Sequence, residues 1–106
     1  MKDNTIEFLN RIRTTILGKI PDAQIFVFGS RARGAANKDS DWDILILLPN
    51  ERINSKDESI LTDPLYDLEL ETGEVISPFI YSETEWNNRY SITPLYKQIQ
   101  LEARRL

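Results

Sequence analysis

The chain has 106 residues, of which 28% are charged and 41% are hydrophobic, and it contains neither cysteine nor histidine. These two absences exclude a disulfide, a thiol nucleophile, a zinc site built from cysteine or histidine, and an imidazole acid–base catalyst. Thirteen basic and seventeen acidic residues give a formal net charge of −4, so we expect no general binding to nucleic acids. The length fits one domain, which we expect to span residues 1–106.

The sequence also bears on location. No basic segment followed by an apolar run stands at the N-terminus, which argues against a secretory signal. The apolar run at residues 44–48 is far too short to span a bilayer. We therefore expect a cytoplasmic protein with no membrane partner.

The first half of the chain predicts one helix and two strands. Apolar residues recur every three or four positions over residues 4–20, which is typical of an amphipathic helix. Residues 24–28 have the β-branched and aromatic composition of a short buried strand, and residues 29–34 behind it have room for one or two helical turns. Residues 42–48 predict the second strand.

The acidic stretch at residues 51–74 is harder to interpret. Its polar first part favours a loop or a frayed helix, after which Pro64 is expected to restart the chain. Two alternatives remain open for the second part of the stretch. One is a helix that ends at Gly73, and the other is a strand over residues 66–71 that turns back through the same glycine.

The remaining residues predict one more strand and two helices. Residues 75–81 form the strand, which Pro78 restricts to an edge or a bulge. A capping pattern at residues 82–85 predicts a helix, and Thr93 followed by proline opens another. We expect four apolar residues to share one face of that last helix: Leu95, Ile99, Ala103 and Leu106. The predicted fold class is α+β, with a short mixed sheet of three or more strands flanked by helices.

The most informative pair of residues is Asp41 and Asp43. Residues two apart on a strand point to the same face, so these two carboxylates lie about 6–7 Å apart at their Cα atoms. Like charges placed this way repel each other unless a cation lies between them. Mg²⁺ suits the pair, because it prefers a few carboxylates and completes its shell with water and phosphate oxygens.

A second group of residues, at positions 29–33, suits phosphate. Gly29 allows a phosphate to approach the backbone, and Ser30 adds a hydroxyl donor at the start of a short helical turn. Arg31 and Arg33 add fixed positive charge. A phosphate-binding turn and a metal-binding strand therefore stand next to each other in the chain.

The chain carries a pattern of three parts, which are Gly29-Ser30, ten intervening residues and Asp41-Trp42-Asp43. This pattern resembles the signature of the polymerase-β-type nucleotidyltransferase superfamily, and most closely its minimal nucleotidyltransferase (MNT) family. The resemblance implies a small nucleotidyltransferase fold. It also implies Mg²⁺-dependent transfer of a nucleoside monophosphate, AMP from ATP in the first instance or from another nucleoside triphosphate, to an acceptor hydroxyl. By the same resemblance, one or two Mg²⁺ ions are held by Asp41 and Asp43, the triphosphate is held by Gly29 and Ser30, and Arg31 and Arg33 are candidates for the phosphate side.

The family has a third carboxylate on a later strand, and here the sequence departs from it. The best register of the third strand places Ser77 at that position, and a serine cannot replace a carboxylate as metal ligand and base at neutral pH. If residues 66–71 form a strand instead, Asp67 or Glu69 supplies the acid.

The resemblance is compatible with three functions. The first is an active enzyme that serves as the antitoxin of a helical HEPN-type toxin, some antitoxins of this kind adding adenylate to a tyrosine of the toxin. The second is a binding module that regulates a partner by contact after losing catalysis. The third, a transferase acting on small molecules of the aminoglycoside type, needs a further helical domain.

Overall fold

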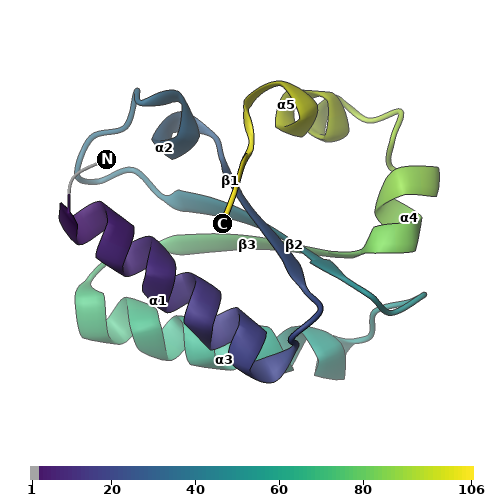
Figure 1. Ribbon diagram of the computed structural model, residues 1–106, viewed down its shortest axis with the longest axis horizontal. Helices are drawn as coiled ribbons and strands as arrows, with labels where there is room; N and C mark the ends of the chain where they lie inside the picture. Colours follow the sequence, from purple (N-terminus) through teal and green to yellow (C-terminus); the bar gives the residue numbers. More distant parts are fainter. Residues whose placement is uncertain (1–2) are drawn as a thin grey trace.

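The computed structural model describes residues 3–106 as four strands and five helices (Figure 1). The sheet has the order β3-β2-β1-β4. In chain order the elements are α1 (Asp3–Lys19), β1 (Gln24–Phe28), α2 (Ser30–Arg33), β2 (Trp42–Leu48), α3 (Ser55–Thr72), β3 (Ile76–Ser82), α4 (Glu83–Asn88), α5 (Pro94–Glu102) and β4 (Arg104–Arg105).

The sheet is mixed, as its predicted fold class requires. Strands β1 and β2 are antiparallel, β2 and β3 are parallel, and the short β4 pairs antiparallel with the other side of β1. Strand β3 therefore lies at an edge of the sheet, which confirms the position predicted from Pro78. A proline lacks the N–H that a central strand needs on both sides.

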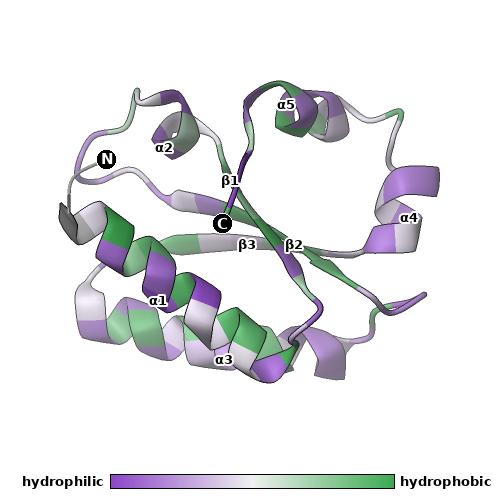
Figure 2. Cartoon of the chain, viewed as in Figure 1, coloured by the Kyte–Doolittle hydropathy of each residue, from purple (hydrophilic) through white to green (hydrophobic). Residues whose placement is uncertain are grey.

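Helices cover both faces of the sheet, so the molecule has three layers. Helices α1 and α3 lie side by side on one face, and α4 and α5 cover the other (Figure 1). Side chains alternate along β2, since Trp42 and Ile44 pack under α1 and α3 whereas Leu45 and Leu47 pack against Trp86 of α4. Polar and hydrophobic residues alternate along α1 and α3 (Figure 2), and none of the helices within residues 3–106 is both long and apolar enough to cross a membrane.

Helix α3 corrects the prediction for the acidic stretch. It runs without a break through Pro64, where we expected the chain to restart, and ends at Gly73 in the left-handed conformation. The strand alternative for residues 66–71 is therefore wrong. Proline removes one hydrogen bond from a helix interior, but three leucines on the inner face of α3 are buried against the sheet and α1 and stabilise the helix: Leu61, Leu65 and Leu68.

The C-terminal end also differs from its prediction. Helix α5 ends at Glu102, and the chain continues as β4, whose two arginines pair with Phe26 and Val27 of β1. The backbone N–H of Leu106 donates to the carbonyl of Ile25, and its side chain packs on the α1 side of the sheet. Leu106 therefore does not share a helix face with Ile99, because free backbone groups at the edge of β1 are paired by this segment instead.

Candidate active site

The two aspartates lie where β2 begins, on the sheet face that α4 and α5 cover. Asp43 is half-buried, and its strand neighbours are Phe28 on β1 and Ser77 on β3. Asp41 is exposed and precedes the first residue of the strand. The hydroxyl of Ser77 donates to Oδ2 of Asp41 across 3.5 Å, a long hydrogen bond that reaches over the same face.

The electrostatics of Asp43 favour a bound cation. Burial raises the pKa of its carboxyl above the ordinary value, and the negative charges of Asp41 and Glu102 raise this pKa further. The guanidinium of Arg33 acts in the opposite direction and lowers the pKa of Asp43. The repulsion exceeds what this one arginine compensates, so an additional positive charge beside Asp43 would stabilise its ionised form.

Gly29 allows the turn after β1 to lie directly against Asp43. Its backbone has φ +74° and ψ −158°, a conformation that is close to glycine-only. A Cβ atom added to Gly29 would overlap Oδ2 of Asp43 and lie 3.2 Å from its Cγ. Because Gly29 has no side chain, the predicted phosphate turn can lie against the predicted metal-binding strand.

The two arginines of α2 have different surroundings. Arg33 is half-exposed, and its Nη1 lies 2.9 Å from Oε2 of Glu102, on α5. Arg31 is mostly buried and points into the loop that leads to Asp41, where its guanidinium donates to the carbonyl of Ser40. Arg33 therefore lies at the site, whereas Arg31 does not face it.

Sequence reasoning missed Glu102, a charged residue that lies near Asp43 and pairs with Arg33. It stands 69 residues from Arg33, and neither spacing nor periodicity connects them. Only the return of α5 over the sheet brings its carboxylate near Asp43, so no local signal was available to find it.

The third-carboxylate position of the sheet is occupied by serine. In the parallel register of β2 and β3, Ser77 is the partner of Asp43, as the best register predicted. The alternatives, Asp67 and Glu69, lie on α3 instead. Glu69 accepts a hydrogen bond from the backbone N–H of Ile76 at 2.8 Å, so its carboxylate caps the start of β3.

Asp41 and Asp43 suit a Mg²⁺ ion that keeps several water molecules among its ligands. Within residues 3–106 no group of three or more acidic, cysteine or histidine side chains is arranged to enclose a metal ion. The pair of Asp41 and Asp43, one exposed and one half-buried, matches an ion that binds to one or two carboxylates and keeps water and phosphate oxygens as its other ligands.

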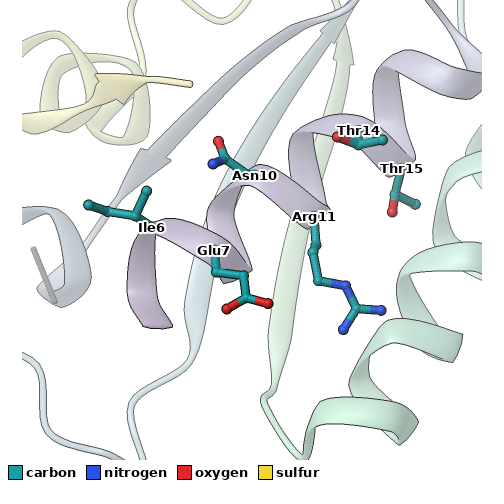
Figure 3. A pocket seen from close by; sticks show the side chains of 6 residues that line it. All are labelled: Ile6, Glu7, Asn10, Arg11, Thr14 and Thr15. Carbon is teal, nitrogen blue, oxygen red and sulfur yellow. The ribbon is translucent and has the colours of Figure 1, made fainter. Parts of the chain in front are cut away.

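A separate hollow lies along α1, on the opposite side of the sheet from the two aspartates. Its six lining residues all come from that helix, and Figure 3 shows Arg11 extending toward α3, where it pairs with Glu71. The lining residues are Ile6, Glu7, Asn10, Arg11, Thr14 and Thr15. This hollow shares no residue with the candidate active site.

Comparison with known families decides the classification. Residues 9–105 match the model of the nucleotidyltransferase domain. The chain belongs to this family. The match covers every element from the second half of α1 to β4, so the nucleotidyltransferase domain includes the glycine turn, both aspartates and Glu102.

Two curated relatives of this nucleotidyltransferase domain are adenylyltransferases by name. The protein adenylyltransferase MntA of Aphanizomenon flos-aquae is 43% identical over 51 residues, which are 47% of this chain and 34% of the relative. The chain thus matches only about a third of that protein's length. A putative protein adenylyltransferase of Methanocaldococcus jannaschii is 34% identical over 83 residues, which are 78% of this chain and 75% of the relative.

Solved structures confirm the nucleotidyltransferase fold. A toxin–antitoxin structure with AMP-PNP superposes with a TM-score of 0.65 at 18% identity, covering 91% of this chain and 69% of that one. The complex of a tri-AMPylated HEPN toxin of Shewanella oneidensis with an MNT antitoxin gives a TM-score of 0.59 at 18% identity, covering 92% and 67%. At this identity the likeness establishes the fold.

Proposed function

We propose that the protein is a Mg²⁺-dependent nucleotidyltransferase that transfers AMP from ATP to a hydroxyl group. The observation that carries the proposal is the contact of Gly29 with Asp43, which joins a phosphate-binding turn to a pair of carboxylates with an unbalanced negative charge. The family match and the adenylyltransferase names of two relatives support it. ATP as substrate is consistent with the cytoplasmic location that we expect.

Each residue of the site has a place in this reaction. Asp41 and Asp43 would hold Mg²⁺, which would neutralise charge on the phosphates. Gly29 and Ser30 present backbone and hydroxyl donors to the triphosphate, and Arg33 adds a positive charge there. A bond forms between the acceptor oxygen and the α-phosphorus, the bond from that phosphorus to the bridging oxygen breaks, and pyrophosphate leaves. Ser77 cannot act as a base at neutral pH, and Asp41 and Asp43 would be engaged with the metal, so in this proposal the acceptor proton passes to solvent water.

We propose further that the acceptor is a tyrosine hydroxyl of a helical HEPN-type partner protein. Two of the structural relatives are toxin–antitoxin complexes, one of them with an AMPylated HEPN toxin and an MNT antitoxin. The site has an open side that suits a protein acceptor, because Asp41 is exposed and Asp43 is only half-buried.

Transfer of radioactive label tests the proposal. The protein is incubated with α-labelled ATP, Mg²⁺ and a HEPN-type protein encoded beside it, and we expect label on the partner. Asp43→Asn should abolish the labelling. Asp39→Asn is the matched control, because it removes the same charge from an exposed position of the neighbouring loop. This variant should still label the partner. Absence of label with folded wild-type protein would refute the proposal.

Ser77 favours a second candidate function, in which the protein regulates its partner by binding alone. With serine beside Asp43, the strand carries no third carboxylate. The two candidate functions predict different results for one double variant. If the protein with both Asp41→Asn and Asp43→Asn still suppresses the partner's activity, contact is sufficient, whereas loss of suppression with retained binding supports the enzyme.

A further inference from the structure

Arg31 forms a closed cluster of contacts around the loop that precedes β2. Its Nε and Nη2 donate to the carbonyl oxygen of Ser40 at 3.2 and 2.7 Å, and its guanidinium carbon lies 4.3 Å from the ring centroid of Trp42. Its Nη2 is also 3.5 Å from Oε2 of Glu74. We call Arg31, Ser40, Trp42 and Glu74 the Arg31 clamp.

The clamp holds the residues on both sides of Asp41. The indole N–H of Trp42 donates to Oε2 of Glu74 at 3.0 Å, so the same carboxylate binds both the arginine and the tryptophan. The backbone N–H of Trp42 donates to the carbonyl of Val75 at 2.8 Å. The clamp therefore ties α2, the loop over residues 34–41 and the starts of β2 and β3 together at one point.

Asp41 needs such support from its neighbours. Its carboxylate is exposed, accepts a long hydrogen bond from Ser77 and is repelled by the charge of Asp43. The 3.5 Å hydrogen bond from Ser77 holds Asp41 only weakly, whereas the mostly buried guanidinium of Arg31 fixes the neighbouring backbone through two hydrogen bonds to the carbonyl of Ser40.

We propose that Arg31 is a positioning residue that sets the place of Asp41, and that it does not bind the triphosphate. Both arginines are paired with a glutamate, but the side chain of Arg31 is only 14% exposed and holds the carbonyl of Ser40, whereas that of Arg33 is 50% exposed and lies beside Asp43. The clamp deepens the proposed function, on which its role in catalysis rests. Groups that orient a metal ligand typically change metal affinity or activity by about 10–100-fold when they are replaced.

The variant Arg31→Lys tests the assignment, with Arg33→Lys as the matched control. Lysine keeps the charge but cannot donate from two nitrogens at once to the carbonyl oxygen of Ser40. For Arg31→Lys we expect faster amide hydrogen exchange at residues 37–41 than in the wild type, and about tenfold weaker binding of Mn²⁺, used as a probe without nucleotide. The KM for ATP at saturating Mg²⁺ should remain within about twofold, whereas Arg33→Lys should raise it.

Two results would overturn the assignment. A tenfold rise in the KM for ATP with unchanged exchange and Mn²⁺ binding would show that Arg31 binds phosphate. Faster exchange spread evenly over the sheet would show that it only stabilises the fold. If wild-type protein transfers no AMP, the proposed function fails, but hydrogen exchange and Mn²⁺ binding still decide whether Arg31 positions Asp41.

Discussion

Replacement of Gly29 by alanine should damage both the fold and the site. Position 29 has φ +74° and ψ −158°, and a non-glycine residue in this region costs about 1–3 kcal/mol. The new Cβ also overlaps Oδ2 of Asp43, so the aspartate must leave its preferred rotamer at about 0.5–1.5 kcal/mol. Together the two effects predict a loss of about 1.5–4.5 kcal/mol in the free energy of unfolding.

The same substitution should slow the chemistry. A shift of Asp43 by about 1 Å is enough to lower a reaction rate by about 100-fold when a reacting group loses its position. Urea unfolding measures the stability, and AMP transfer measured where the variant is still folded gives kcat.

Gly73→Ala is the control for the backbone effect. Gly73 also has a positive φ, +77°, but a Cβ atom there meets nothing within 4 Å. This variant should lose about 1–2 kcal/mol and keep kcat within about threefold. If Gly29→Ala is no less stable than Gly73→Ala and has the wild-type kcat, the contact between Gly29 and Asp43 does not matter and the reasoning is refuted.

The remaining predictions concern charge and helix structure. Glu102→Gln frees Arg33 from an ion pair worth about 0.2–1 kcal/mol, so the KM for ATP in steady-state kinetics should fall by about 1.4–5-fold. A rise in KM would contradict the idea that Glu102 and the triphosphate compete for Arg33. Asp41→Asn removes a like charge, so the pKa of Asp43 in a carbon-detected NMR titration should fall toward the ordinary value. Because the pKa of Asp43 is raised in the folded state, the protein loses stability as the pH rises through that pKa. Asp43→Asn should therefore increase the free energy of unfolding at neutral pH. A decrease would contradict the direction of the pKa shift. Pro64→Ala restores a hydrogen-bond donor inside α3 and should stabilise the protein by about 1–2 kcal/mol in urea unfolding, and an unchanged or lower free energy of unfolding would contradict this.

The parts of the fold that could be predicted are those with strong local patterns. Strands β1 and β2 have dense β-branched and aromatic runs bounded by turn residues, and their observed limits are the predicted ones. Helix α3 was misjudged at Pro64, because the burial of its leucines against α1 and the sheet is a tertiary effect. Strand β4 was missed, since two arginines carry no strand pattern of their own.

For the site, sequence reasoning located the short segment of chain but not all of its contacts. Gly29 lies against Asp43, which agrees with the expectation that the turn after β1 and the start of β2 form one site. The different surroundings of Arg31 and Arg33 depend on Glu74 and Glu102, which arrive from distant elements. Partners so far apart in the chain leave no periodic trace in the sequence.

Because the two faces of β2 carry different residues, the strand does not tolerate the insertion or deletion of a single residue. One face of the strand carries the aspartate and the other carries buried Trp42 and Ile44. A single-residue insertion or deletion within β2 would exchange the two faces, so that the acid would enter the apolar core under α1 and α3. The neighbouring exposed loop tolerates extra residues at a small entropic cost, about 0.6 kcal/mol for a doubling in length. Homologues that arose by insertion should therefore differ between residues 34 and 39, ahead of the Ser40 that the Arg31 clamp holds, and keep β2 at constant length.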